Sequence, residues 1–380
     1  MFNKVIDEIY KKHGKQNDLI IYDPKRSVQA IPSGCFAIDM VTGYNGLAVR
    51  GRLVEIFGME SSGKTTVAIQ SCAETLKLPG ELGVLYVDSE QTFDHSYARS
   101  LGVDVETNSR FLVVQPNNAE EGIDIIDSTF KKLGDKLGLI VIDSIAAFKP
   151  KSMMEGNPLE SGQKGVHAQL WSEFAPRLNS WAKVNNTAVL LINQLRAKIS
   201  IDRNSQFSAS NTGMGAGFSN TDTQLTTTGG NALRFYLSAR YLLQHSSNIK
   251  ESVVNTLTDE IEEQRVANLI TIKNVKSKVS SPFSTAKFVI RYGEGTDDSE
   301  PIFNLCKAKG VIKNTGSWFE YKGSNESLNI RENGRVRFMD KFRHHEYLED
   351  AKKQILSDGG LENLGIDKID ASVEGEEVDL

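Results

Sequence analysis

Apolar residues along the chain fall into two alternating patterns, and these patterns predict alternating strands and helices. Short, nearly continuous apolar runs are typical of strands buried on both faces, and they occupy residues 52–57, 83–88, 111–114, 139–142 and 188–192. Apolar residues recur at helical spacing between these runs, at residues 65–77, 95–101, 120–133 and 168–184. The alternation favours an α/β fold with a central, mostly parallel, twisted sheet flanked by helices.

The pattern changes near the N-terminus and again in the middle of the chain. Residues 2–12 are expected to form a short amphipathic helix that packs either on its own domain or on another subunit. Residues 200–228 are almost all polar and predict a long structureless loop, which in a compact domain is usually functional or disordered. Further strands are expected at residues 240–243, 268–273 and 286–292, with an acidic surface excursion at residues 251–263.

A second change of composition, at residues 293–300, predicts a small α+β domain that ends near residue 358. Residues 359–380 then contain seven acidic side chains and one lysine, and we expect them to form a disordered acidic tail. The whole chain has a formal net charge of only −5, so most of the excess acid lies in this tail. The acidic balance therefore does not argue against a nucleic-acid partner.

The overall composition, 39% hydrophobic and 24% charged among 380 residues, is that of a soluble globular protein. No apolar run is long enough to span a membrane, and the N-terminus lacks the layout of a signal peptide, so no membrane partner is expected. The cysteines, Cys35, Cys72 and Cys306, are widely separated and show neither metal-binding nor redox spacing. We therefore expect buried thiols and a cytoplasmic location.

The most specific motif is a Walker A phosphate loop, which follows a predicted strand and precedes a predicted helix. Gly58 and Gly63 allow a tight turn in which backbone N–H groups point at phosphates. Lys64 can reach the β- and γ-phosphates of a nucleotide, and the Thr65 hydroxyl can ligate Mg²⁺. The nucleotide-binding residues are therefore Gly58, Met59, Glu60, Ser61, Ser62, Gly63, Lys64, Thr65 and Thr66.

Polar side chains follow three of the predicted strands. Glu90 stands shortly after the strand at residues 83–88, and Asp143 follows residues 139–142 in a Walker B pattern, as a second Mg²⁺ ligand. Asn193 and Gln194 follow the strand at residues 188–192. The carboxyl ends of parallel strands meet at one edge of the sheet, where ligands bind in open α/β folds. These groups are therefore expected around the nucleotide.

Six blocks of sequence, in order, closely resemble the RecA recombinase family. They are GMESSGKTT at 58–66, DSE at 88–90 followed by Asp94 and by YAR at 97–99, VIDS at 141–144, NQLR at 193–196, TTTGGNAL at 226–233 and KSK at 276–278. The resemblance covers residues 28–325, and residues 293–321 look like the start of the family's C-terminal domain. It implies an N-terminal oligomerisation helix and linker at residues 1–27, a RecA-like P-loop ATPase core at 28–295 and a C-terminal domain at 296–358.

The resemblance also assigns roles around an ATP molecule. It implies that Glu90 polarises the attacking water, and that Asp143, with Ser144 beside it, holds the Mg²⁺ shell. Tyr97 is expected to stack on adenine, and Asp94 to approach the amino edge of that base. The alternatives are a helix-capping carboxylate at position 90 and a core tyrosine at position 97.

Three further residues are implied to act in catalysis. Gln194 would sense the γ-phosphate and pass its state to the loop that follows. Lys276 and Lys278 would reach across a subunit junction to the neighbour's γ-phosphate, which makes ATP part of a head-to-tail interface of the kind that generates filaments. The alternative for the two lysines is a basic surface pair.

Two segments match the family's DNA-binding loops, residues 155–165 and residues 195–228. The second loop is longer than usual, and an apolar side chain in it could wedge between bases. In the first loop Lys164 occupies a commonly apolar tip, and Gln169 and Pro176 stand where arginines are frequent, which puts its grip on DNA in question. The expected DNA-binding residues are Lys164, Arg196, Lys198, Phe207, Gly229, Gly230, Asn231 and Arg234.

The leading interpretation is an ATP-dependent recombinase. It would form a filament on single-stranded DNA, hydrolyse ATP in a DNA-stimulated way and exchange strands with a homologous duplex; mediator and single-strand-binding proteins are further expected partners. The alternative is a RecA-like ring-shaped helicase or repair motor ATPase. A ring helicase needs a primase-binding domain and a late arginine finger, and the zinc-bearing repair relatives need a CxxC pair; the sequence offers none of these.

Overall fold

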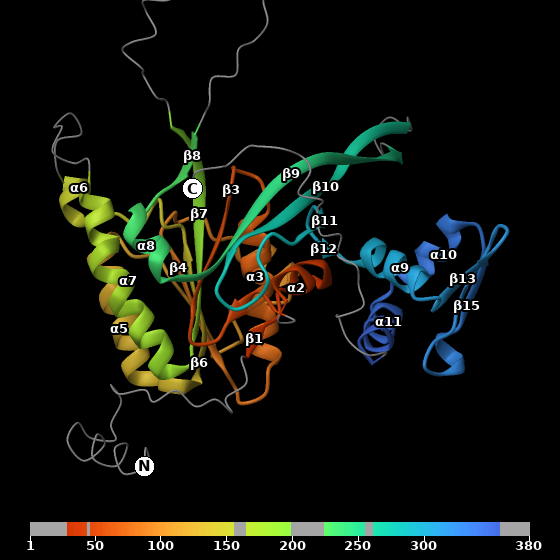
Figure 1. The fold of residues 1–380 in the computed structure, drawn as a ribbon, viewed down its shortest axis with the longest axis horizontal. Helices are drawn as coiled ribbons and strands as arrows, with labels where there is room; N and C mark the ends of the chain where they lie inside the picture. The colour runs from red at the N-terminus through yellow and green to blue at the C-terminus, as the bar shows by residue number, and fades with distance from the viewer. Residues whose placement is uncertain (1–28, 44–45, 156–164, 199–223, 255–260, 358–380) are drawn as a thin grey trace, which may run out of the picture.

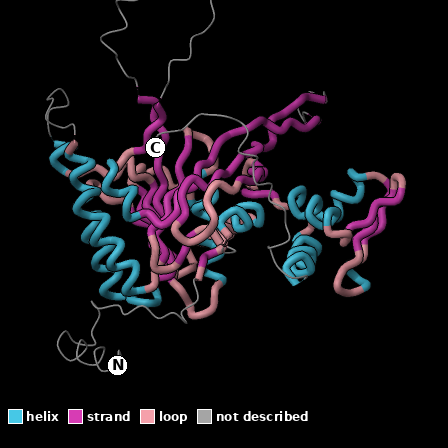
Figure 2. The backbone as a smooth tube through the Cα atoms, viewed as in Figure 1, coloured by secondary structure: helices cyan, strands magenta, loops and turns pink. Residues whose placement is uncertain are grey.

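The computed structural model describes residues 29–43, 46–155, 165–198, 224–254 and 261–357. It confirms the α/β fold: one large sheet carries helices on both faces, and a smaller lobe lies to one side (Figure 1). The tube view separates the same parts by secondary structure, with the central strands between two layers of helices (Figure 2). In the described residues, no helix has the length and apolar character needed to cross a bilayer.

The large sheet has a parallel half and an antiparallel half, in the order β12-β11-β10-β9-β3-β7-β6-β4-β5. The parallel strands are β5 (Phe111–Val114), β4 (Gly83–Asp88), β6 (Leu137–Asp143), β7 (Ala188–Lys198), β3 (Leu53–Gly58) and β9 (Leu237–Val254). The antiparallel strands are β10 (Ile261–Ser277), β11 (Thr285–Arg291) and β12 (Gly295–Asp297), and β8 (Gln224–Thr227) pairs with the end of β7. The parallel strands end at one common edge.

Helices cover the two faces of the sheet separately (Figure 1). One face carries α2 (Phe36–Thr42), α3 (Lys64–Lys77) and α4 (His95–Ser100), with the short pair β1 (Ala30–Ile31) and β2 (Ala48–Val49) beside them. The other face carries α5 (Ala119–Leu133), α7 (Val166–Asn185) and α8 (Gly230–Tyr236). Two short elements, η1 (Gly134–Lys136) and α6 (Lys151–Glu155), follow α5 and β6.

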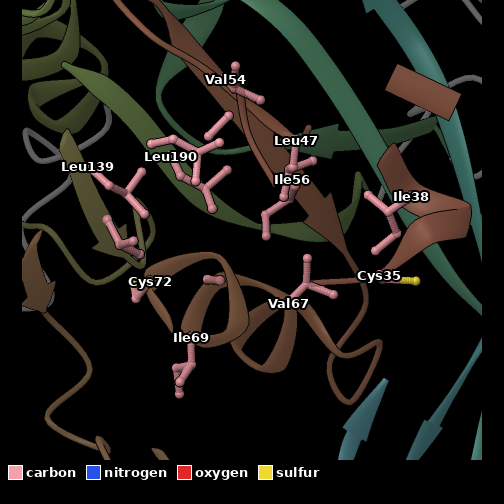
Figure 3. Packing of buried hydrophobic residues seen from close by; sticks show 14 of the residues in the cluster. Cys35, Ile38, Leu47, Val54, Ile56, Val67, Ile69, Cys72, Leu139 and Leu190 are labelled. Carbon is pink, nitrogen blue, oxygen red and sulfur yellow. The ribbon is translucent and has the colours of Figure 1, made fainter. Parts of the chain in front are cut away.

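Alternation along the strands divides the apolar side chains between these two faces, because successive residues of a strand point in opposite directions. The side chains of α3 lie against one face of the strands, and Figure 3 shows this packing for Val54, Ile56, Val67, Ile69, Cys72, Leu139 and Leu190. Leu53, Ile140 and Leu191 face the other cluster, with α5 and α7. Full burial of each such side chain stabilises the fold by about 1.5–3 kcal/mol, so the strand ends that carry the site are firmly held.

The C-terminal lobe, residues 299–357, has its own apolar cluster around Phe303, Phe338 and Phe342. It consists of α9 (Ser299–Ala308), β13 (Ile312–Thr315), β14 (Trp318–Tyr321), η4 (Glu326–Leu328), β15 (Ile330–Asn333), α10 (Arg335–Phe342) and α11 (His345–Ser357). Phe36 of α2 packs against this cluster from the core side. The proposed domain limits stay predictions, and the N-terminal helix and the acidic tail lie outside the described residues.

The structure refines two expectations about loops. In the acidic stretch at 251–263, Glu251 and Glu263 are exposed, as expected for a surface excursion, but they belong to strands β9 and β10 of a long antiparallel hairpin. Cross-strand pairing and ion pairs such as Lys250 with Glu263, 3.3 Å apart, extend the strands there despite their low hydrophobicity. The stretch at 200–228 is likewise not wholly structureless, because its last residues form β8.

Candidate active site

The phosphate loop joins β3 to α3 and requires glycine at both ends. A side chain at Gly58 would place its Cβ 2.2 Å from the backbone oxygen of Leu243 on the neighbouring strand. Gly63 has a φ of +83°, in the left-handed region, and stands directly before the first turn of α3. The N-terminus of α3 therefore opens onto the loop, and its unpaired N–H groups are suited to an anion.

Lys64 lies across the loop with its ammonium group at the centre. Its Nζ donates to the backbone oxygens of Met59 at 2.7 Å and Gly58 at 3.2 Å, and to Ser62 Oγ at 3.3 Å. Burial lowers the pKa of Lys64, while the carboxylates of Asp143 and Glu90 oppose this change. The ammonium is thus held where the phosphates of a nucleotide would meet the loop.

Asp143 ends β6 next to the first turn of α3. Its Oδ2 accepts hydrogen bonds from Thr65 Oγ1 at 2.9 Å and from the Tyr86 hydroxyl at 2.7 Å. Burial raises the pKa of Asp143 to about 6, and these two hydrogen bonds act in the opposite direction. A carboxylate and a hydroxyl in contact are hard oxygen donors, the kind of group that Mg²⁺ prefers.

Glu90 is held by side chains from two other strand ends. Its Oε1 accepts from Ser144 Oγ at 2.5 Å and from Gln194 Nε2 at 2.9 Å. Glu90 is otherwise exposed, and its charge is close enough to the phosphate loop to counteract the lowering of the Lys64 pKa by burial. The structure therefore brings Glu90, Ser144 and Gln194 together, and Glu90 does not cap a helix.

The capping carboxylate is Asp94 instead. Its Oδ1 accepts from the backbone N–H groups of Ser96 at 2.8 Å and Tyr97 at 3.0 Å at the start of α4. The Tyr97 hydroxyl is 2.8 Å from Thr66 Oγ1, and its ring is half-buried against the core. Tyr97 therefore stands beside the first turn of α3. The contacts of both residues with adenine stay a prediction.

Lys276 and Lys278 lie in another part of the subunit. Lys276 Nζ donates to the Arg234 backbone oxygen at 2.5 Å, and Lys278 Nζ donates to the Phe235 backbone oxygen at 2.7 Å. Both ammonium groups thus bind the C-terminal end of α8, which packs with α7 on the face opposite α3. The structure does not bring them to the phosphate loop of their own subunit.

The predicted DNA-binding residues are only partly described. Arg196 and Lys198 belong to β7, in register with Thr226 and Gln224 of β8, so the strands on either side of residues 199–223 form a two-stranded stem. Gly229 precedes α8, which contains Gly230, Asn231 and Arg234. Arg234 donates to Thr227 Oγ1 at 3.4 Å. Lys164 and Phe207 lie outside the described residues.

Two buried charged residues directly behind the site, Glu55 and Arg240, were not predicted as functional. Asn193 was expected around the nucleotide, but it is buried with them and binds Glu55 instead. Arg240 Nε donates to Glu55 Oε2 at 2.5 Å, and both side chains are at most 4% exposed. A signal existed, because Glu55 interrupts an apolar run, and a charge in a buried strand needs a counter-charge. Its partner stands 185 residues away, which no local pattern indicates.

Comparison with known proteins adds independent findings. The family model of the RecA N-terminal domain matches residues 1–297, which include every predicted site residue. Protein RecA of Thermotoga maritima is 34% identical over 344 residues, 89% of this chain and 86% of that protein. Protein RecA of Bifidobacterium longum is 36% identical over 317 residues, 83% of this chain and 70% of that protein. Protein RecA of Bacteroides thetaiotaomicron is 36% identical over 317 residues, 83% of this chain and 85% of that protein.

Proposed function

The chain belongs to the RecA family, and on this premise we propose that it is a recombinase that forms a helical filament on single-stranded DNA and exchanges strands with a homologous duplex. DNA binding, a DNA-dependent ATPase activity and a role in recombination and repair come with the family. The contact of Gln194 with Glu90 carries the proposal for this chain. Gln194 stands where β7 leaves the ATP site and enters the stem of the second DNA loop, so one residue adjoins both.

Hydrolysis of ATP follows from the residues around the loop. Lys64 and the N-terminus of α3 bind the phosphates, and Glu90 orients the attacking water and accepts its proton. Mg²⁺ fits the oxygen donors of Thr65 and Asp143, and when bound it neutralises phosphate charge. Ser144 and Gln194 hold the Glu90 carboxylate in place for this task. If DNA binding moves Gln194, the Glu90 carboxylate moves with it.

Self-assembly is supported by two surfaces of the subunit. Phe235 at the end of α8 is 75% exposed beside the backbone oxygen that Lys278 binds, and an exposed aromatic next to two lysines suits a contact with another subunit. We assign Lys276 and Lys278 to the γ-phosphate bound by the neighbouring subunit. The second surface is a groove of 1040 Å³ beside β5, an edge strand among the described residues, where Leu112 is 52% exposed. We assign this groove to residues 2–12 of a neighbour.

One mixing experiment tests the catalytic and the junction assignments together. Glu90→Ala and Lys276→Ala proteins are each expected to lose DNA-stimulated ATP hydrolysis. In a randomly mixed filament about a quarter of the junctions pair an intact Glu90 with an intact Lys276 of the next subunit, so activity partly returns. The measurement is phosphate release with and without single-stranded DNA, followed by a strand-pairing assay of the wild type.

The matched control is Glu326→Gln, which removes an exposed carboxylate of the C-terminal lobe and is expected to behave as the wild type. Two inactive proteins that assemble together, as seen by cross-linking, and still release no phosphate would place Lys276 outside the neighbour's site. A wild type that hydrolyses ATP at the same rate with and without single-stranded DNA would contradict the proposed function itself.

A further inference from the structure

Asn193 is fully buried, and its side-chain amide is engaged on both sides. Nδ2 donates to Glu55 Oε1 at 2.7 Å and to the Thr228 backbone oxygen at 2.9 Å. Oδ1 accepts from the Gln194 backbone N–H at 2.9 Å and from Thr228 Oγ1 at 2.6 Å. An amide with two donated and two accepted hydrogen bonds is fixed in one orientation, because rotation would break all four.

Glu55 and Arg240 support this amide from behind. One oxygen of Glu55 accepts from Asn193 and the other accepts from Arg240, so both carboxylate oxygens are used. The Arg240 guanidinium also donates to Thr227 Oγ1 at 3.1 Å and lies 4.6 Å from the centre of the Phe57 ring. The network is thus anchored on β3, the strand that leads directly into the phosphate loop.

The position of Asn193 in β7 explains how it can act on the site without entering it. Neighbouring residues of a strand face opposite sides of the sheet. Leu191 packs in the core cluster with α5 and α7, and Asn193 faces the same side of the sheet. Ile192 packs in the cluster with α3, and Gln194, which meets Glu90, faces that opposite side. Asn193 therefore holds the backbone N–H of Gln194 from the face opposite the ATP site.

The same amide also holds the second strand of the loop stem. Leu195 of β7 pairs with Thr227 of β8, and Thr228 is the next residue along the chain. Both strands that lead into the second DNA loop are consequently tied to β3 through one side chain. A displacement of either strand by bound DNA must move Asn193 or break its hydrogen bonds.

We propose that Asn193, supported by Glu55 and Arg240, is a positioning residue that couples the stem of the second DNA loop to Gln194 and hence to Glu90. This inference rests on the proposed function, because it concerns how DNA stimulates ATP hydrolysis. Asn193 touches neither nucleotide nor DNA. Its role is to keep the loop stem and the catalytic amide in one fixed relation.

The test compares Asn193→Ala with the wild type by the stimulation factor, the turnover rate with poly(dT) divided by the rate without it. Unfolding of part of the sample reduces both rates equally and leaves this factor unchanged. Loss of the four hydrogen bonds is expected to reduce the factor by about tenfold or more, since one net hydrogen bond corresponds to roughly a factor of two to twelve. A factor equal to that of the wild type overturns the proposal.

A reciprocal exchange sharpens the test. In Asn193→Asp the new carboxylate faces Glu55, so stimulation is expected to fall as in the alanine variant. Asn193→Asp combined with Glu55→Gln again places one carboxylate and one amide beside Arg240, with the carboxylate now at position 193 and the amide at position 55. At least part of the stimulation is expected to return. A double variant no better than Asn193→Asp alone would contradict a positioning role for the pair.

A milder pair of variants covers the case in which the buried substitutions fail to fold. Thr228→Val removes the hydroxyl that donates to Asn193 but keeps the shape of the side chain, whereas Thr228→Ser keeps the hydroxyl. We expect the valine variant to lose stimulation and the serine variant to retain it. Equal stimulation in both would sink the inference, whereas absence of stimulation in the wild type would instead reject the proposed function.

Discussion

Two buried clusters of charge support different parts of the molecule, and they are balanced differently. Beneath the active site, Glu55 faces Arg240 at 2.5 Å, one negative and one positive group. Between the core and the C-terminal lobe, Asp39 and Asp298 both face a single lysine, Lys352 of α11. The first cluster is neutral, whereas the second has one carboxyl more than it has cations.

The hydrogen bonds of the second cluster come mainly from residues 33–36, just before and at the start of α2. Asp298 accepts from the Phe36 backbone N–H at 2.6 Å and from Cys35 Sγ at 3.2 Å, while Lys352 Nζ stands 3.5 Å away and also binds Glu349 at 3.1 Å. Burial raises the pKa of Asp298, and it raises that of Asp39 to about 7. The junction with the lobe is therefore expected to respond to pH.

The largest effect is expected from Arg240→Met, which leaves the Glu55 charge buried without its partner. Breaking a buried ion pair on one side costs about 3–5 kcal/mol of the free energy of unfolding. Urea unfolding of the two proteins measures this difference. The control is Arg240→Met combined with Glu55→Leu, which removes both charges and is expected to be more stable than Arg240→Met alone. A double variant less stable than Arg240→Met would contradict the view that Arg240 serves to neutralise the buried Glu55 charge.

A smaller effect is expected from Lys352→Met. This change removes the one lysine that faces Asp298 and Asp39, and it is expected to lower the free energy of unfolding by about 1–3 kcal/mol at pH 8. The loss should shrink at pH 5, because Asp39, whose pKa is about 7, is protonated there and needs no counter-charge. Unfolding curves at the two pH values decide this, and an equal loss at both would show that Lys352 acts through packing alone.

The smallest effect concerns Asp39→Asn, which keeps an oxygen to accept the Ser33 backbone N–H. Asp39 has a pKa of about 7 in the folded protein against 3.8 ordinarily. The unfolded chain therefore releases its proton first, and the free energy of unfolding falls as pH rises from 4 to 7. Because Asp39 is only half-buried, we expect the asparagine variant to reduce this fall by about 1 kcal/mol.

Unfolding measured at intervals between pH 4 and pH 8 gives the comparison. Asp340→Asn on α10 provides the control, because the Asp340 side chain is exposed. That variant should follow the wild-type curve. A wild-type free energy of unfolding that stays constant from pH 4 to pH 7 would show that Asp39 does not make the stability depend on pH.

The positions of most elements followed from the sequence, because periodicity is a local property of the chain. The strand at residues 83–88 and the helix near residues 65–77 needed only the spacing of apolar residues. The phosphate loop was equally local, since its chemistry lies in nine consecutive residues with a strand before them and a helix after. The length of the hairpin of β9 and β10 was not predicted, because cross-strand hydrogen bonds extend it beyond the apolar segments.

Only the tertiary structure decided which distant residues share a site. Gln194 meets Glu90 across 104 residues, and Arg240 meets Glu55 across 185, because the parallel strands place their ends side by side. The sequence named Asp94 for adenine, and the fold placed its carboxylate on the first turn of α4. It identified Lys276 and Lys278 by resemblance, and the fold placed their ammonium groups against the C-terminal end of α8, away from their own phosphate loop. The periodicity that predicts helices and strands is a property of neighbouring residues. Which distant side chains meet depends on the order of the strands in the sheet, and no short segment of sequence determines that order.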